Sequence, residues 1–562
     1  MSDRRKLLRD LAVLLIVLLP WFLALLGARP LNVPDEGRYP EVAREMLMSG
    51  DFITPRVNGA LFLDKPALYY WLQAASFAVF GVSIASVRLM PALFGVAGCL
   101  LVFVAGWRFF NRRTAWLAAL TMAASPLYFL ASQYANLDLE VAVWITAALF
   151  GFLFAQAEPV DSPRRRLYFA LAYLAGGFGV LTKGLIGIVL PAIAIFAWML
   201  WRRRWRDLPR WSLPLLPIGV LAVCLPWYTA VQLHNPQFLH FFFVYQQFER
   251  FSGGGFNNAL PAWFYPAILA LGLLPWTFWL PAALKRAWQQ RGEAGDLRAF
   301  LLAWPAVILL FFSLPTSKIA GYILPVVPPL ALLLGAYLDE WLDAAKGRNW
   351  LPRISAVVLI ALALVAFFSA GKEWQHPQRA LQHPELPWLL LGMGATLLAG
   401  ALACLSSLRG KALHAVIGLV LAGIGLCAWA VPLVPCYDKE SIRTTAARML
   451  PKLTADTVIV NYRNYFQDLP LYLNRHEPIR VVDDWTDPNI VKVDNWRREF
   501  FYALKDQPEA RGWLLDEAAF AALLRGPRPV MVVLTSDLAD EVQRRYQLQE
   551  VSRTPRFVVL SR

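Results

Sequence analysis

Long apolar runs recur along residues 1–434 and constrain the fold of this chain more than any other sequence feature. A helix needs about 20 apolar residues to cross the hydrocarbon core of a bilayer, and about 13 segments approach that length. Every backbone polar group inside lipid must be satisfied by the protein itself, so repeated runs of this length predict a polytopic α-helical membrane protein. The candidate spans lie near residues 10–28, 89–109, 114–131, 138–156, 167–181, 184–201, 213–231, 262–283, 299–314, 322–338, 352–370, 387–407 and 412–434.

The composition of the chain agrees with this fold class. Hydrophobic residues make up 58% of the 562 residues and charged residues 17%, whereas charged residues are about 25% of a typical soluble domain. The net charge of +15 would suit a nucleic-acid partner, but the basic residues lie in short clusters between the apolar runs, as membrane topology requires. We therefore expect membrane lipids, and no nucleic acid, as partners of the chain.

The five cysteines predict neither a disulfide framework nor a zinc motif. Four of them fall within apolar segments, and their spacing along the sequence is not that of metal ligands. These cysteines are Cys99, Cys224, Cys404, Cys427 and Cys436.

The basic residues also predict the orientation of the chain in the membrane. Cytoplasmic loops carry an excess of Lys and Arg, and every second loop of the predicted topology is basic if the N-terminus is cytoplasmic. No small-residue cleavage pattern follows the basic segment Arg4–Arg9, so we expect the first apolar run to remain as a helix. The tail after the last span is then extracytoplasmic.

The segment Leu31–Trp71 is too polar to lie in hydrocarbon and carries a dense group of charges next to a span. Carboxylates and cations in this position suggest a site for a phosphorylated substrate, although an ordinary extracytoplasmic loop is also polar. Four further loops bring polar groups to the same predicted face of the membrane, where such groups are costly unless they are paired or functional. The candidate residues are Asp35, Glu36, Arg38, Arg56, Asp64 and Lys65 in the first loop, and Asp138, Lys183, Arg250, Lys318 and Tyr322 in the others.

Two further patterns complete the expected architecture. Residues 40–49 and 66–80 carry apolar side chains at helical spacing and are predicted to form two amphipathic helices along the membrane interface. After Pro435, β-branched runs at 457–462, 479–482, 529–534 and 557–560 alternate with helical stretches at 439–453, 516–524 and 538–546. We expect a transmembrane domain at 1–434, with its first extracytoplasmic loop at 29–88, and a small extracytoplasmic α/β domain at 435–562.

Several of these motifs, in this order, resemble the signature of a known enzyme group. They are Asp35-Glu36, Thr54-Pro55-Arg56, Asp64-Lys65-Pro66, Leu181-Thr182-Lys183-Gly184, Pro226-Trp227-Tyr228, Phe248-Glu249-Arg250-Phe251 and Ser317-Lys318 with Tyr322. This set is similar to that of the polyprenyl-phosphate-sugar-dependent glycosyltransferases of the GT-C fold. The resemblance is strongest to the bacterial 4-amino-4-deoxy-L-arabinose transferases of lipid A modification, and protein O-mannosyltransferases are more distant relatives. It implies a multi-pass enzyme of the bacterial inner membrane, an undecaprenyl-phosphate-linked sugar donor, and lipid A or another extracytoplasmic acceptor.

The chain departs from the pattern of these transferases at two positions. They usually carry Glu before the Lys-Pro pair and a His before Glu-Arg-Phe, whereas this chain has Asp64 and the run Tyr245-Gln246-Gln247. A metal site that depended on that Glu and His would be weakened. We therefore predict that the enzyme requires no metal.

The resemblance and the residue types together imply roles for the candidates. Lys65 and Arg250 would neutralise the donor phosphate, because guanidinium and ammonium groups bind phosphate oxygens well. Arg56, Lys183, Lys318 and Tyr322 would support them. Asp35, with Asp138 behind it, would orient or deprotonate the acceptor, and Glu36, Arg38 and Asp64 are further site candidates. By analogy with the family, we expect direct displacement with inversion at the sugar carbon.

Structural roles remain open for most of these residues. Asp138 is placed to cap the helix that follows it, Glu36 to pair with a loop arginine, and Lys65 and Lys183 to extend toward the membrane interface. Arg250 is suited to a stabilising ion pair, and Tyr322 to packing. A lipid or sugar transporter also needs charge within the membrane, but it would be expected to show internal repeats and broken helices at the midplane. No such repeat is visible in this sequence.

Overall fold

The computed structural model describes residues 3–243, 259–292, 296–344, 350–375, 383–438, 441–492 and 495–562. Contacts divide the chain into two compact units. The first unit comprises Met1–Arg29, Pro91–Pro226 and Asn258–Tyr437. The second comprises Pro30–Met90, Trp227–Asn257 and Asp438–Arg562.

The first unit is built from α-helices, and every predicted span overlaps at least one of them. Seven helices in the described residues are long and apolar enough to cross a membrane, or up to nine if each of two bent helix pairs forms one span. The polytopic helical fold is confirmed, whereas the number of about 13 spans stays a prediction. The helices are α1 (Asp3–Leu23), α4 (Ile84–Phe109), α5 (Arg112–Ala123), α6 (Pro126–Ser132), α7 (Leu137–Gln156), α8 (Pro163–Lys183), α9 (Ile186–Arg202), α10 (Leu215–His234), α12 (Phe264–Gly272), α13 (Leu280–Gln289), α14 (Leu297–Ser313), α15 (Val327–Asp343), α16 (Trp350–Trp374), α18 (Leu386–Ser407) and α19 (Leu413–Tyr437), with 3-10 turns η1 (Trp205–Arg210), η3 (Trp276–Phe278) and η4 (Ala320–Val326); α4 and α10 include residues of both units.

One predicted span, 114–131, is broken into α5 and α6, which meet at 64°. Pro126 explains the break, since the residue before a proline is driven out of the helical region. Ser125 accordingly has ψ 122°, in the extended region, and Pro126 begins α6.

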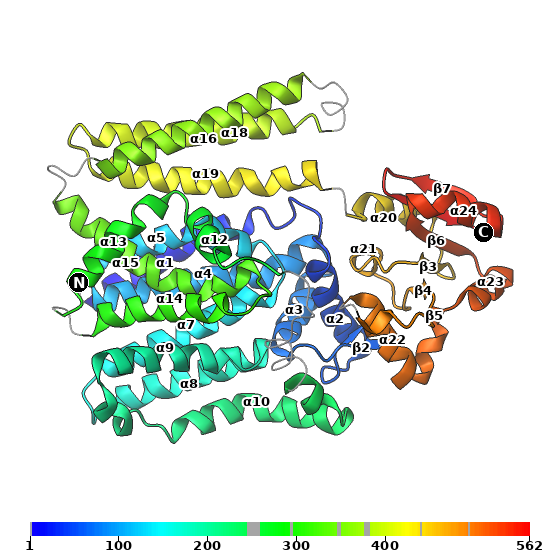
Figure 1. Cartoon of the computed structure of the whole chain (residues 1–562), viewed down its shortest axis with the longest axis horizontal. Coiled ribbons are helices and arrows are strands. Elements are labelled where there is room, and N and C mark those ends of the chain that lie inside the picture. The colour runs from blue at the N-terminus through cyan, green and yellow to red at the C-terminus, as the bar shows by residue number, and fades with distance from the viewer. Residues whose placement is uncertain are drawn as a thin grey trace. The chain divides into compact units, whose positions relative to one another are not determined.

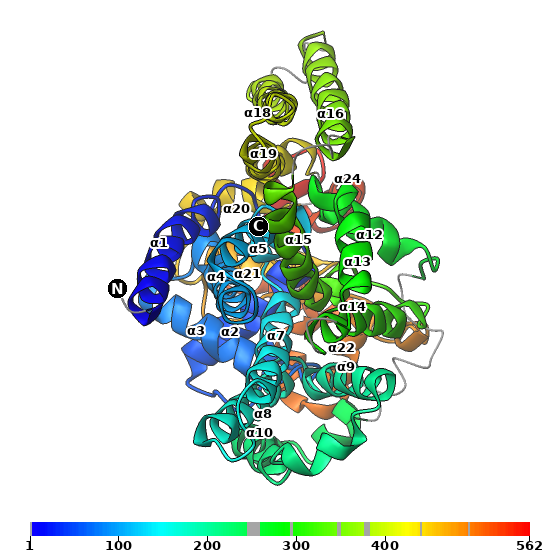
Figure 2. The same cartoon turned by 90° about the vertical axis from the view of Figure 1, so that its left-hand side faces the viewer.

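Three long helices, α16, α18 and α19, pack side by side (Figure 2). Small residues allow this close approach, as is common between membrane helices. A Cβ atom on Gly400 of α18 would lie 2.7 Å from the carbonyl oxygen of Gly418 on α19. Only a short loop joins α18 to α19, so the two helices run antiparallel, and the N-terminal end of α18 lies beside the C-terminal end of α19.

The N-terminal part of the second unit contains the two predicted amphipathic helices. They are α2 (Asp35–Ser49) and α3 (Leu68–Phe80), and between them β1 (Arg56–Val57) and β2 (Ala60–Leu61) form a hairpin. Gly50 ends α2 with φ 73°, a left-handed conformation that favours glycine. Gly37 lets α2 pack against the chain at Gln467, where a Cβ atom would come within 2.6 Å of a carbonyl carbon.

The C-terminal part of the second unit is an α/β fold with a six-stranded sheet in the order β5-β4-β3-β6-β8-β7 (Figure 1). The first four strands of this order are parallel, and β8 and β7 are antiparallel. The four predicted runs correspond to β3, β4, β6 and β8. The elements are α20 (Arg443–Met449), η5 (Leu450–Lys452), β3 (Val458–Tyr462), α21 (Leu469–Leu473), β4 (Arg480–Val482), η6 (Ile490–Lys492), α22 (Trp496–Asp506), η7 (Pro508–Gly512), β5 (Leu514–Leu515), α23 (Glu517–Arg525), β6 (Val530–Thr535), α24 (Ser536–Tyr546), β7 (Gln549–Arg553) and β8 (Phe557–Ser561).

Alternate side chains of the central strands enter two different cores. Val460 and Val532 face one side of the sheet, where they pack with Phe520 of α23. Ile459 and Val533 face the other side, where Ile442 and Leu469 lie. Helices therefore cover both faces of the sheet, and this explains why the parallel strands are mostly apolar.

Candidate functional site

Arg38, in the first turns of α2, is the centre of a charged cluster in the second unit. Its Nη1 donates a hydrogen bond to Glu499 Oε1 at 2.9 Å, and its Nη2 lies 3.6 Å from Asp35 Oδ1. Burial alone would lower the pKa of Arg38, but the attraction of Glu499 and its neighbouring acids, Asp35 and Asp64 among them, outweighs burial and raises that pKa. The structure therefore brings together three of the predicted site residues, Asp35, Arg38 and Asp64.

The surroundings of the Arg38 cluster are aromatic. The guanidinium carbon of Arg38 lies 5.3 Å from the ring centres of both Tyr39 and Phe62. Tyr70, on α3, is fully buried, and burial followed by the charges of Tyr39 and Asp64 raises the pKa of its phenol. All three rings are buried, so they pack around the Arg38 guanidinium and help to fix its position.

Glu36 is adjacent to Asp35 but occupies a different environment. Arg88 donates from Nε to Oε1 and from Nη2 to Oε2 of Glu36, each at 2.8 Å. Both side chains are almost completely buried, at 0% and 1% exposure. Arg88 also donates to Pro30 O, and Glu36 accepts from Asn32 N. These contacts favour the structural interpretation of Glu36, that of an ion-pair partner which fixes the start of α2.

Lys65 lies at the end of the same loop. Its Nζ donates to the carbonyl oxygen of Asp64 at 3.1 Å, and both residues are half-buried.

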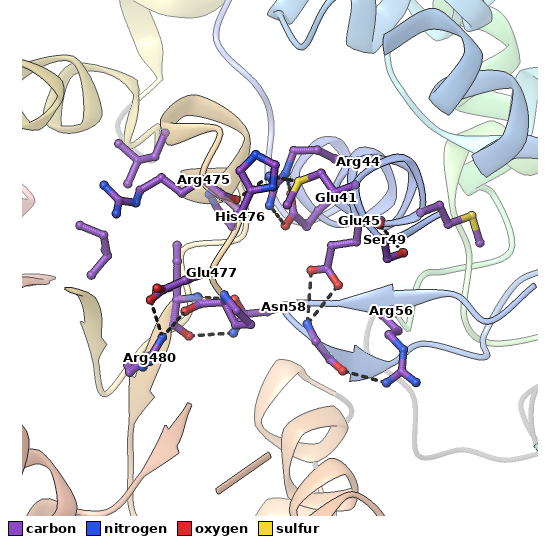
Figure 3. Close-up of a pocket in the computed structure, with 18 of the residues that line it drawn as sticks. Glu41, Arg44, Glu45, Ser49, Arg56, Asn58, Arg475, His476, Glu477 and Arg480 are labelled. Carbon is purple, nitrogen blue, oxygen red and sulfur yellow. Dashed lines mark hydrogen bonds and ion pairs between the residues drawn. The ribbon is translucent and has the colours of Figure 1, made fainter. Parts of the chain in front are cut away.

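The second unit contains a polar cavity of about 250 Å³ between α2, the β1–β2 hairpin and the start of β4 (Figure 3). Arg44 pairs with Glu41 through two hydrogen bonds of 2.6 and 2.7 Å. Glu45 accepts from the backbone of Gly59 at 3.1 Å, and burial, reinforced by Glu41, raises the pKa of Glu45 to about 8. Of the predicted site residues, Arg56 lines this cavity and donates to Gly59 O at 3.2 Å.

The turn that shapes this cavity is encoded in the sequence Asn58-Gly59. Both residues have positive φ, 50° and 78°, which is typical of the two-residue turns that match the twist of a β-hairpin. The Asn58 amide donates to Ile479 O at 2.9 Å and accepts from Ile479 N at 2.8 Å. These two bonds hold the β1–β2 turn against the residue that precedes β4.

In the first unit, three predicted site residues from three elements meet. Lys183, at the end of α8, forms an ion pair with Asp138 on α7, and its Nζ lies 4.9 Å from the centre of the Tyr322 ring of η4. A side chain at Gly321 would collide with the Asp138 carboxylate, so glycine permits the approach of η4. The helix cap of α7 is Asn136, whose Oδ1 accepts from Asp138 N at 2.9 Å. The capping role considered for Asp138 is therefore wrong.

Two other charged residues of the first unit are buried. Lys318 is 4% exposed and donates to the backbone oxygen of Leu260 at 3.1 Å. This bond holds together the two segments that pair at Ala259 and Ser317. Glu140 is fully buried on α7, and neither of its carboxyl oxygens has a hydrogen-bond partner among the residues that the structure describes. A buried acid in a span is expensive and marks a functional candidate.

Arg250, one of the two residues expected to hold the donor phosphate, lies outside the described residues, as does the run 245–247. Sequence reasoning did not select Glu499 or Arg88. Arg88 is an isolated charge in a conspicuously apolar stretch, and this was a usable signal. Glu499 lies in a highly charged segment of the C-terminal region, and no local pattern distinguishes it.

Similarity to known proteins identifies the family to which the chain belongs. The family model for dolichyl-phosphate-mannose-protein mannosyltransferases matches residues 11–242. An undecaprenyl phosphate-α-4-amino-4-deoxy-L-arabinose arabinosyl transferase of Shewanella sediminis is 31% identical over 494 residues, which is 84% of this chain and 86% of the relative. A transferase of the same description from Pseudomonas fluorescens is 35% identical over 382 residues, 68% of each chain.

The fold is also that of a solved structure. The crystal structure of ArnT from Cupriavidus metallidurans bound to undecaprenyl phosphate superposes with a TM-score of 0.82 at 24% identity. The match covers 98% of this chain and 97% of that one. The GT-C fold predicted from the motifs is therefore confirmed, and the chain belongs to the family of undecaprenyl phosphate-α-4-amino-4-deoxy-L-arabinose arabinosyl transferases.

Proposed function

We propose that this glycosyltransferase moves 4-amino-4-deoxy-L-arabinose from undecaprenyl phosphate to lipid A. The observation that carries the proposal is the 31% identity to the Shewanella sediminis transferase over 84% of the chain. The donor in this proposal follows from the names of that relative and of others, which specify undecaprenyl phosphate and the sugar. The acceptor rests on the family resemblance of the motifs.

The chemistry of the proposed reaction is a direct displacement. A phosphate oxygen of lipid A attacks the anomeric carbon of the sugar, the bond from that carbon to the donor phosphate breaks, and undecaprenyl phosphate leaves with the electron pair. The acceptor oxygen is already anionic, so the step needs no strong base, and the anomeric configuration inverts. The protein must neutralise charge on the leaving phosphate and orient the sugar.

The candidate residues suit these two tasks. In the second unit, Lys65 and Arg56 are assigned to the donor phosphate, with Arg250 as their partner. Asp35 would position the sugar or offset positive charge on its ring, and Arg38 and Glu499 hold Asp35 in place. In the first unit, we assign a joint role to Asp138 and Lys183, which orient each other through their ion pair. Tyr322 and Lys318 are assigned to support Lys183.

The proposal also includes the setting of the reaction. The N-terminus would be cytoplasmic and the C-terminal α/β region periplasmic, in the inner membrane, because the basic loops alternate with the acidic and mixed ones. Labelling of single introduced cysteines with a membrane-impermeant reagent tests this topology. A residue in the sheet should be labelled in intact spheroplasts, and one in the loop at 202–206 should not.

A transfer assay tests the activity itself. Purified protein in lipid nanodiscs is given undecaprenyl-phosphate aminoarabinose and lipid A, and the acceptor is followed by mass spectrometry. The proposal expects a mass increase equal to one aminoarabinose residue. Transfer to a peptide hydroxyl instead of lipid A would replace the acceptor, and movement of the donor between leaflets without transfer would favour a transporter.

Cationic side chains are proposed to replace a metal at the donor phosphate. Lys65→Ala should therefore lower the rate of transfer by about 10²-fold or more, as loss of one preorganised donor to a developing anion does. A chelator should leave the rate of the unaltered enzyme unchanged. A rate that collapses with the chelator and returns with a divalent cation would overturn the metal-free mechanism.

A further inference from the structure

Three metal-binding side chains meet at one end of the α18–α19 helix pair, although the sequence shows no metal motif. His383 and Glu385 precede α18, and Cys436 lies in the last turn of α19. One donor atom from each of the three side chains lies within 4.8 Å of the other two. None of these residues belongs to the proposed transferase site.

We propose that His383, Glu385 and Cys436 bind a divalent cation of the zinc type. Glu385 Oε1 lies 3.5 Å from His383 Nδ1 and 3.6 Å from Cys436 Sγ. In tetrahedral zinc sites the metal lies about 2.0–2.3 Å from N, O and S ligands, which sets the distances between ligand atoms at about 3.3–3.6 Å. The two distances around Glu385 therefore already match two edges of such a tetrahedron.

The donor types also select this class of cation. Thiolate and imidazole favour zinc and similar transition metals, whereas magnesium and calcium prefer oxygen ligands alone. A thiolate and a carboxylate together balance a charge of +2. Binding releases the thiol proton of Cys436. With three protein ligands, a water molecule would complete the coordination.

The site is accessible and rests on a firm framework. His383 and Cys436 are half-buried and Glu385 is exposed, so an ion can enter from solvent. The close contact of Gly400 with Gly418 fixes the pairing of α18 and α19, and hence which residues meet at their ends. A bound cation would hold the end of α19 to the segment that enters α18, and the free energy of unfolding would rise with the logarithm of its concentration above Kd.

Cobalt titration of the full-length, metal-stripped protein in nanodiscs tests the site. Tetrahedral Co²⁺ with a thiolate ligand gives visible ligand-field bands and a near-ultraviolet thiolate-to-metal band. We expect one equivalent of Co²⁺ per chain to produce both bands, and Zn²⁺, but not Mg²⁺, to remove them. Absence of the thiolate band in the folded protein would overturn the proposal.

Two serine variants on the same helix separate the site from general effects of cysteine loss. Cys436→Ser should abolish the thiolate band and the rise in Tm that Zn²⁺ produces, whereas Cys427→Ser, which removes a buried cysteine outside the cluster, should keep both. His383→Ala serves as the second ligand variant and should also lose the Zn²⁺-dependent rise in Tm. A Cys436→Ser protein that keeps one equivalent of Co²⁺ with unchanged bands would refute the assignment.

Transfer by Cys436→Ser should stay near that of the unaltered enzyme, because this cation site and the transferase site are independent.

Discussion

Asp35 and Glu36 are adjacent at the start of α2, yet their ion pairs differ in nearly every physical respect. Glu36 forms a buried ion pair with Arg88, here called the sealed pair, in which both side chains are at most 1% exposed. Asp35 lies 3.6 Å from Arg38, and these side chains are 24% and 19% exposed. A sealed pair has no room for a substrate and can only hold the fold, whereas a partly open pair can exchange a protein contact for a ligand contact. Partial exposure therefore separates the chemical candidate from the structural one better than the residue type does.

Breaking the sealed pair should have the largest effect in this comparison. Arg88→Ala leaves the Glu36 carboxylate buried without its partner, which typically costs about 3–5 kcal/mol. Thermal unfolding in detergent should show a large decrease in Tm and a reduced yield of folded protein. Arg56→Ala, which removes a half-buried arginine that donates a hydrogen bond to the backbone oxygen of Gly59, serves as the control and should lower Tm far less. Equal losses in the two variants would show that the Glu36–Arg88 pair does not hold the fold.

Changing the open carboxylate should affect the reaction instead. Asp35→Asn keeps the size of the side chain but removes its charge, and we expect transfer to fall by about 10²–10⁴-fold, the range for loss of a positioned acid or base. The Tm should remain close to that of the unaltered protein. The same substitution at Asp51, whose carboxylate caps Ile53 and Thr54 in the same loop, is the matched control and should retain transfer. A normal rate in Asp35→Asn would remove this residue from the site.

Glu499 is the second ion-pair partner of Arg38, and Glu499→Gln tests whether this partly exposed pair also serves the reaction. The pair is 19% and 23% exposed, so loss of its charge should cost less stability than loss of Arg88, whose fully buried pair typically costs about 3–5 kcal/mol when broken. If Glu499 positions Arg38, kcat should fall while KM for the donor changes little, and Glu499→Asp should restore part of the rate. A decrease in Tm without any change in kcat would assign Glu499 to folding alone.

The smallest expected effect is on the pH dependence of stability, through buried acids of the second unit. Burial raises the pKa of Glu45 to about 8 and that of Asp468 to about 7, above their values in the unfolded chain. The folded state therefore binds more protons than the unfolded state between about pH 4.5 and 8, and stability falls as pH rises through this window. Glu45→Gln should reduce the decrease in Tm between pH 5 and 8.5 without abolishing it, since Asp468 remains.

Much of the fold follows from patterns with a simple physical origin. Runs of about 20 apolar residues are required by the thickness of the bilayer, and the strands β3, β4, β6 and β8 are continuous β-branched runs because they are buried on both faces. The strand β7, Gln549–Arg553, was not predicted. It lies at the edge of the sheet with mostly exposed polar side chains, and edge strands of this kind carry no apolar pattern.

The candidate site could be predicted only in part, because sequence motifs name residues and not their partners. The Asp-Glu motif identified both acids of α2 but could not show that Glu36 is sealed by Arg88. Arg38 and Glu499 are 461 residues apart, and Cys436 is 51 residues from Glu385. Such pairs depend on how helices and strands pack, which local spacing does not encode.

The bidentate contact between Glu36 and Arg88 has a kinetic consequence for its neighbour. A catalytic carboxylate on a loose loop would have to search many backbone conformations during every catalytic cycle, and the entropy of that search would add to the activation barrier. Because residue 36 is immobilised when the protein folds, the backbone of residue 35 is immobilised with it. If Asp35 acts in the reaction as proposed, ordering of its segment is thus completed once, during biogenesis of the enzyme, and is not repeated at each turnover.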